Sequence, residues 1–152
     1  MNLMKTKKEI FKTLLKEKGD KALLDVKYMG ISADDIIESY HELGLDSPIK
    51  LVKNTWLKRY DDKPISHGWG NGYVRIPDGH EFNGMEYMDI PVDVHGGLTF
   101  GRYIEEGDYL DFSKGFWVGF DTAHHSDTLQ RWPVDRVMEE TIDLFKQIYG
   151  LE

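Results

Sequence analysis

The sequence predicts an α+β fold in one domain of 152 residues: N-terminal helices, a small and mainly antiparallel sheet, and a C-terminal amphipathic helix packed on that sheet. Apolar residues recur at helical spacing in the first 45 residues and again after Pro133. Between these regions lie short runs rich in β-branched and aromatic residues, punctuated by glycines. Helices, then strands, then a helix, in a chain of ordinary single-domain length, are typical of the α+β class.

The first 45 residues are expected to form a helical extension of a core that spans residues 68–150. A first helix is predicted over residues 4–18, where Ile10, Phe11, Leu14 and Leu15 recur among lysines and Gly19 follows as a stop. A short second helix is predicted over residues 20–29. Ser32 followed by Asp35 is a capping signal for a third, which ends at Gly44.

The middle of the chain is expected to supply the sheet. Residues 49–60 fit neither period well, so strand and short helix both stay open there. Residues 68–72, rich in glycine, are interpreted as a turn. Strands are predicted at residues 73–76, 90–95, 98–103 and 116–120.

The C-terminal helix is the most regular pattern in the chain. Pro133 suits a first-turn position, and an apolar stripe follows it at spacings of three and four. The stripe consists of Val134, Val137, Met138, Ile142, Phe145, Ile148 and Tyr149.

Composition excludes several classes of function. The chain has no cysteine, so a disulfide framework, a thiolate metal site and a cysteine nucleophile are all excluded. Residues 1–30 carry eight lysines against four acids, a net +4, whereas residues 31–152 carry 11 basic against 23 acidic side chains, a net −12. An acidic body makes nucleic acid an unlikely partner. No apolar run has the length of a signal peptide or membrane span, so a cytoplasmic protein without membrane contact is expected.

Strand alternation gathers polar residues on one face of the predicted sheet. In residues 91–95, Asp93 and His95 alternate with two valines, and in residues 116–121 the apolar Phe116, Val118 and Phe120 alternate with Trp117, Gly119 and Asp121. Asp93, His95 and Asp121 are therefore expected on the face opposite Val94 and Val118. Gly96 and Gly97 follow the first strand, and His124 and Asp127 follow the second.

This set of residues suits more than one chemistry. His95 or His124 could act as a general base oriented by Asp93 or Asp121, because imidazole titrates near neutral pH. Histidine and aspartate could instead hold a divalent cation, although no diagnostic metal motif is present. The candidate catalytic residues are His95, Asp121 and His124. The candidate ligand-binding residues are Asp93, Gly96, Gly97, Thr99 and Asp127, with Trp117 or Trp69 for stacking.

Each of these features also has a purely structural interpretation. Gly96 and Gly97 can form a hairpin turn, Asp121 can cap a strand or helix, and His124 and His125 can lie on the surface or pack.

Three segments in this order resemble a family of small uncharacterised phage and prophage proteins. They are GYVRIPDGH at residues 72–80, VDVHGGLTF at residues 92–100 and GFDTAH at residues 119–124. The resemblance covers residues 68–149 and leaves the helical first 45 residues as an extension. It implies a viral accessory protein in the bacterial host cytoplasm, with His80, His95, Asp121, His124 and Asp127 as the polar positions of the family.

The first functional hypothesis is a pocket for a small polar or phosphorylated, nucleotide-like molecule, used against a host defence. A metal-assisted hydrolase and an acidic protein that blocks a host protein are the alternatives. Enzymatic turnover, the identity of any metal and homo-oligomerisation stay open on sequence alone.

Overall fold

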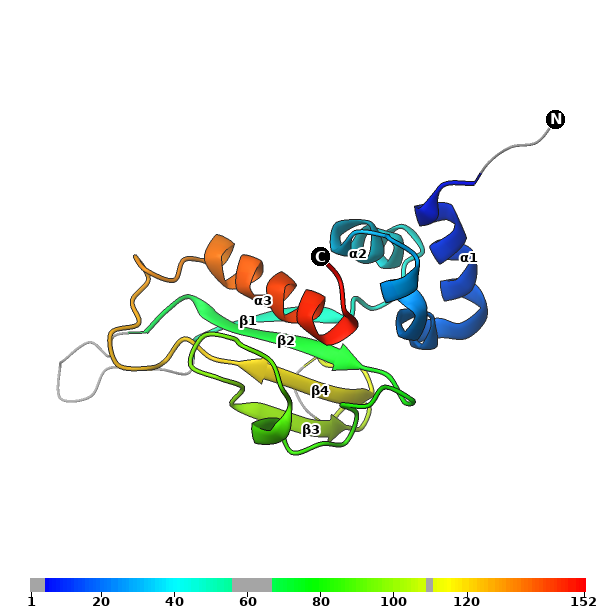
Figure 1. Cartoon of the computed structure of the whole chain (residues 1–152). Helices are drawn as coiled ribbons and strands as arrows, with labels where there is room; N and C mark the ends of the chain where they lie inside the picture. Colours follow the sequence, from blue (N-terminus) through cyan, green and yellow to red (C-terminus); the bar gives the residue numbers. More distant parts are fainter. Residues whose placement is uncertain (1–4, 56–66, 109–110) are drawn as a thin grey trace.

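A computed structural model describes residues 5–55, 67–108 and 111–152. Within these residues, four strands form one antiparallel sheet in the order β1-β2-β4-β3, and α3 packs over β1 and β2, which confirms the predicted α+β class (Figure 1). The principal elements are α1 (Lys7–Lys18), α2 (Ala33–Glu42), β1 (Ile49–Lys53), β2 (Gly70–Ile76), β3 (Phe100–Ile104), β4 (Gly115–Phe120) and α3 (Val134–Tyr149).

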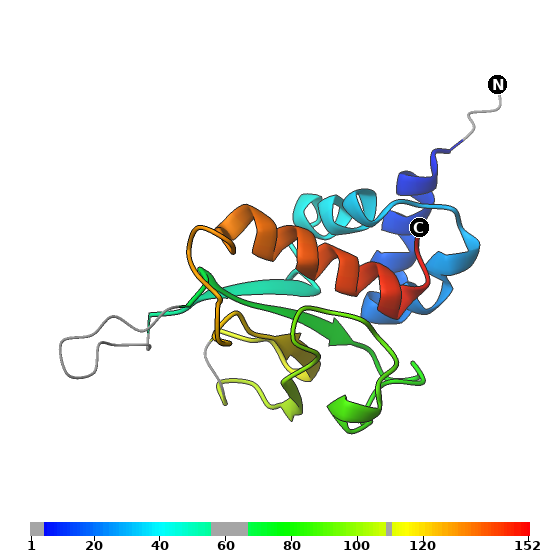
Figure 2. The ribbon, with the colours of Figure 1, turned by 60° about the vertical axis from the view of Figure 1, so that its left-hand side comes forward.

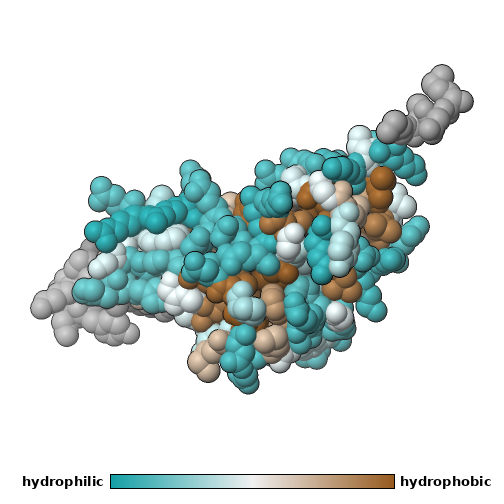
Figure 3. Space-filling view, in the orientation of Figure 1, coloured by the Kyte–Doolittle hydropathy of each residue, from teal (hydrophilic) through white to brown (hydrophobic). Residues whose placement is uncertain are grey.

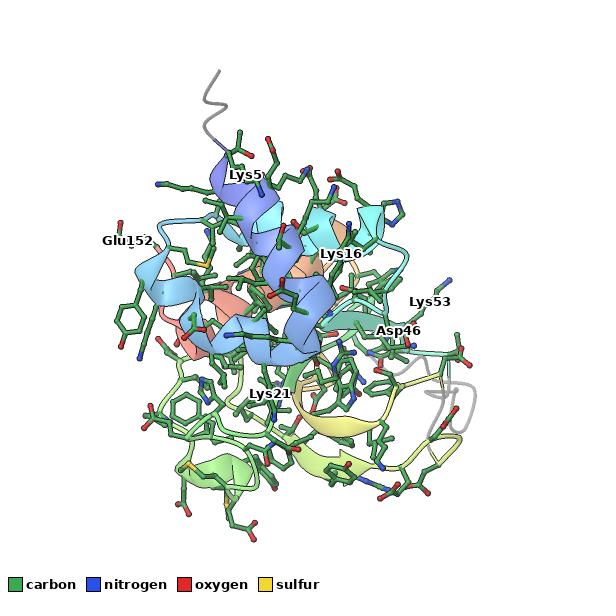
Figure 4. The ribbon with its side chains drawn as sticks, turned by 90° about the vertical axis from the view of Figure 1, so that its right-hand side faces the viewer. Lys5, Lys16, Lys21, Asp46, Lys53 and Glu152 are labelled. Carbon is green, nitrogen blue, oxygen red and sulfur yellow. The ribbon has the colours of Figure 1, made fainter. Side chains whose placement is uncertain are left out.

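The N-terminal helices begin and end at the residues that cap them. Thr6 accepts a hydrogen bond from the Glu9 amide at the start of α1, and Gly19 ends that helix with φ of +61°. The second helix is a 3₁₀ helix, η1 (Gly19–Tyr28), rather than an α-helix. Ser32 accepts from the Asp35 amide as the capping signal predicted. Figure 4 views the molecule from the side of these helices, where Lys8 and Lys12 of α1 form ion pairs with acidic side chains of α2.

These helices share one hydrophobic cluster with the sheet and α3. Phe11 of α1 and Tyr40 of α2 are buried together with Val118 and Phe145. The helical extension is therefore packed on the core rather than attached by a linker.

A buried ion pair also joins the helices to the sheet. Arg75 of β2 is 6% exposed and contacts Asp20 of η1 through two nitrogens, while another of its nitrogens donates to Ser113 Oγ at 2.6 Å. Tyr40 donates to the same Asp20 carboxylate at 2.6 Å. Burial, followed by the negative charge of Asp20, raises the pKa of Tyr40 far above its ordinary value.

The two faces of the sheet bury different clusters. Phe116, Val118 and Phe120 face the main core beneath α3, as the alternation predicted for this strand. Trp117 lies in a smaller cluster with Tyr73, Ile104 and Phe112. Figure 2 shows α3 crossing one face, which leaves the second cluster to the other.

The interpretation of residues 68–72 as a turn was wrong for its second half, because Gly70–Ile76 is β2. Gly72 lies where α3 crosses the strand. A Cβ added there would clash with Thr141 Oγ1 of α3 and lie 2.6 Å from Phe120 Cε1. The glycine is therefore required by close helix packing and not by a turn.

The predicted strand at residues 90–95 does not form, so the parity argument for Asp93 and His95 was wrong. The Asp93 amide donates to Gln147 Oε1 at 2.7 Å, and the His95 amide donates to Glu140 Oε2 at 2.9 Å. Side chains of α3 thus replace the ladder that a neighbouring strand would have supplied. Val94 is still buried in the main core.

The open segment at residues 49–60 contains β1 at its start, and its residues 56–60 lie outside the described residues. In α3, Val137, Phe145 and Ile148 are buried as predicted, whereas Val134 and Met138 are exposed. Pro133 precedes the helix as its N-cap.

The face drawn in Figure 3 is mainly hydrophilic, with hydrophobic residues gathered near its middle. None of the described helices combines the length and apolarity needed to cross a membrane.

Candidate metal centre

Two turns bring His95, His124 and Asp127 together beyond the end of β4. Nε2 of His95 lies 2.9 Å from Oδ1 of Asp127, and Nδ1 of His124 lies 3.1 Å from Oδ2 of the same carboxylate. One ligand atom from each of the three residues lies within 4.8 Å of the others. Residues 124–127 follow the end of β4, which is the end of the sheet where β1 also ends and β2 begins (Figure 1).

Backbone geometry explains how the two histidines meet. In residues 94–97 the Gly97 amide donates to the Val94 carbonyl at 2.8 Å, with Gly96 at φ +69°. In residues 124–127 the Asp127 amide donates to the His124 carbonyl at 3.0 Å, and Ser126 adopts φ of +77°. Left-handed backbone at a serine is uncommon, and such outliers occur most often at functional sites.

The two turns are in direct contact through Gly96. A Cβ added at Gly96 would clash with Cε1 of His124 and lie 2.7 Å from its Nε2. The backbone of the first turn therefore packs against the Cε1 edge of the His124 ring, between its two nitrogens. Gly96 allows this close approach of backbone to ring, and it does not join two strands of a hairpin.

Asp127 is the centre of the cluster and is only 3% exposed. Burial alone would raise its pKa, but hydrogen bonds from the His124 amide and from the rings of His95 and His124 outweigh it, so the pKa lies below its ordinary value. A buried carboxylate that stays ionised beside two imidazoles has the charge and the donors that a cation requires.

Without metal, the lowered pKa of Asp127 predicts a specific loss of stability in acid. The folded pKa is below the ordinary value of 3.8, so the contribution is complete above about pH 5 and is lost as pH falls through the folded pKa. In chelator, Asp127→Asn should cost about 1.5–3 kcal/mol near pH 6, and this difference should shrink below about pH 4. Urea melts of both proteins across this range test it, and a difference that grows in acid would contradict it.

Trp132 supports the cluster and was missed by the sequence analysis, which considered only Trp69 and Trp117 for stacking. Its ring lies 4.1 Å from the ring of His95, centroid to centroid, and the Arg136 guanidinium lies 4.0 Å above Trp132. Trp132 is 5% exposed, so it fixes the plane of the imidazole. Trp132 follows Asp127 by only five residues, and this proximity in the sequence could have marked it as a neighbour of the cluster.

Asp121 connects the cluster to a pocket. Its Oδ1 lies 3.4 Å from Nδ1 of His124 and accepts a hydrogen bond from the Ala123 amide at 3.0 Å. Asp121 and His124 both line a pocket of about 470 Å³. Of the sequence candidates, Thr99 also lines it, together with residues that were not predicted: Val52, Lys53, Thr55, Asn71, Tyr73, Phe100 and Ala123.

Four other candidates lie away from the three donors. Trp117 is 1% exposed and donates from its indole nitrogen to the Ser113 carbonyl at 2.8 Å. His80 is bonded through both ring nitrogens, to the Phe82 amide and the Ile148 carbonyl. Asp93 is exposed, with its backbone held by Gln147, and Gly97 completes the turn after His95. Their positions fit structural roles better than ligand contacts.

The arrangement fits a cation better than a linear acid–base relay. In such a relay one imidazole nitrogen faces the carboxylate and the other faces the substrate. Here both imidazoles turn a nitrogen to one carboxylate, and Gly96 packs against the Cε1 edge of His124. One donor atom from each of the three residues lies within 4.8 Å of the others, and two imidazoles with one carboxylate are a ligand set that zinc accepts. Three protein ligands leave a fourth position for water.

Comparison with known proteins adds no relative: no family model, no curated protein and no solved structure matches this chain.

Proposed function

We propose that the chain is a divalent-metal-dependent hydrolase of a small phosphorylated molecule. In this proposal His95, His124 and Asp127 hold the ion, and Asp121 is the general base. The observation that carries it is the convergence of three ligand atoms within 4.8 Å beside a pocket of about 470 Å³. Pockets for small molecules are typically of this size.

The residues around the ion have distinct parts in the proposed reaction. An ion held by His95, His124 and Asp127 would polarise a water molecule; Asp121 would take a proton from that water, and the water oxygen would bond to phosphorus as the ester P–O bond breaks. Asp121 then returns the proton to the leaving oxygen. Lys53, which lines the same pocket, offsets the charge of the phosphate. The resemblance to phage proteins would make this an activity of a viral accessory protein.

Hydrolysis of p-nitrophenyl phosphate and bis-p-nitrophenyl phosphate tests the proposal. We expect turnover with zinc or manganese that is abolished by a chelator. Asp121→Asn should lower kcat by about 10²–10⁴-fold, the usual contribution of a general base, while metal affinity changes little. His125→Ala, which removes an exposed neighbouring histidine, should leave kcat unchanged.

Two outcomes would contradict parts of the proposal. If metal binds but neither ester is hydrolysed, the hydrolase is wrong and a metal-dependent binding protein remains. If hydrolysis persists in chelator, the ion has no part in the reaction.

A further inference from the structure

We propose that the pocket beside Asp121 recognises the base of a nucleoside monophosphate, with the phosphate placed toward the metal centre. This inference rests on the proposed function, because it names the substrate class of the same site. Asn71, Phe100 and Tyr73 carry it, and none of them takes part in the proposed catalysis.

Asn71 is a buried amide in the pocket wall with one unpaired atom. It is 5% exposed, its Nδ2 donates to the Tyr73 hydroxyl at 3.3 Å, and its Oδ1 has no hydrogen-bond partner among the described residues. Exchanging the amide oxygen and nitrogen would leave the nitrogen unpaired instead. A buried amide in this condition destabilises the fold unless a ligand completes its hydrogen bonds.

Its position in the sheet does not favour asparagine. It lies within β2, opposite Val52 of β1, where β-branched or aromatic residues are preferred. A polar residue that contradicts its local preference and leaves one buried atom unpaired is expected at a functional site. The edge of a nucleobase carries the N–H donors and the acceptors that complement an amide.

Two aromatic residues beside Asn71 line the pocket, and of these the partly buried Phe100 provides a surface for a planar ring, supported by the buried Tyr73. Tyr73 and Phe100 pack edge to face with ring centroids 5.3 Å apart, and both line the pocket. Both pair with Gly119 of β4, where a Cβ would clash with the Tyr73 ring. The glycine therefore allows the aromatic rings to lie across the sheet. Aromatic side chains of this kind are the usual platforms for stacked bases.

The pocket also has charge at a position suited to the phosphate. Lys53 and His124 line the same pocket as the aromatic pair. A base against Asn71 and Phe100 with a phosphate at the cation and Lys53 would place the scissile P–O bond at the metal centre. A sugar phosphate without a base would contact the cation and Lys53 but would leave Asn71 and Phe100 without a ligand.

Calorimetry with nucleoside monophosphates and ribose 5-phosphate tests the inference on the full chain. The nucleotides are the 5′-monophosphates of adenosine, guanosine, cytidine and uridine, each titrated at low temperature with zinc and again in chelator. We expect at least one nucleotide to bind about tenfold or more tightly than ribose 5-phosphate, because base stacking and one hydrogen bond are added.

Two variants test whether the preference for a nucleotide over ribose 5-phosphate arises in this pocket. Asn71→Leu and, independently, Phe100→Leu should each reduce it about fivefold or more while leaving ribose 5-phosphate affinity unchanged. Tyr103→Leu is the matched control, since it removes a half-exposed aromatic side chain from the same strand outside this pocket. Circular dichroism confirms that each variant is folded.

The inference is overturned if no nucleotide binds more tightly than ribose 5-phosphate, or if both variants keep the full preference. These results are independent of the proposed hydrolase, because metal binding and p-nitrophenyl ester turnover are measured without a base. A preference that survives in chelator while those esters are not hydrolysed would retain base recognition and reject the enzyme.

Discussion

Replacing Asp127 by alanine should lower zinc affinity by more than the 10–100-fold that loss of an outer-shell partner costs. Asp127 is hydrogen-bonded to both His95 and His124, so its loss removes a ligand and also the contact that orients the other two. Calorimetric titration of zinc into the parent and the variant measures the effect.

His95→Ala provides a second route to the same result, in case Asp127→Ala does not fold. His125→Ala is the matched control, because His125 is exposed in the same turn and is not one of the three donors. Equal zinc affinity in the parent, Asp127→Ala and His95→Ala would show that the ion binds elsewhere.

Phe145→Ala should cost about 3–5 kcal/mol in the free energy of unfolding, the largest effect on stability expected from one core truncation. Phe145 is 0% exposed and lies in the cluster that joins α3 to the sheet and to the N-terminal helices. Urea denaturation with circular dichroism detection measures the loss.

His124→Ala is the comparison for that experiment. The His124 side chain is 36% exposed, so its removal in chelator should cost far less than removal of Phe145. If both variants lose the same stability, His124 has a structural role and the metal centre loses its main argument.

The fold was predictable where the pattern depends on local chemistry. The capping signal of Ser32 and the apolar spacing around Phe145 require only neighbouring residues, and both predictions were confirmed. Residues 90–95 alternate like a strand, but the amides of Asp93 and His95 are bonded to side chains of α3. No local pattern indicates that side chains far along the chain will replace a β-ladder.

The site was also predictable only where it depends on neighbouring residues in the sequence. His95, His124 and Asp127 lie next to glycines and turns, and this clustering marked them in the sequence. Their convergence on one carboxylate depends on two turns meeting at Gly96, which spacing alone does not encode. Trp132 and Asn71 acquire their roles only through tertiary contacts, with His95 and with the pocket.

Titration of zinc into the unmodified chain by calorimetry tests the central claim most directly. The convergence of His95, His124 and Asp127 predicts saturable binding of one ion per chain. Heats that do not saturate, or that are unchanged in Asp127→Ala, would contradict a metal centre. The cluster would then be a hydrogen-bonded link between two turns.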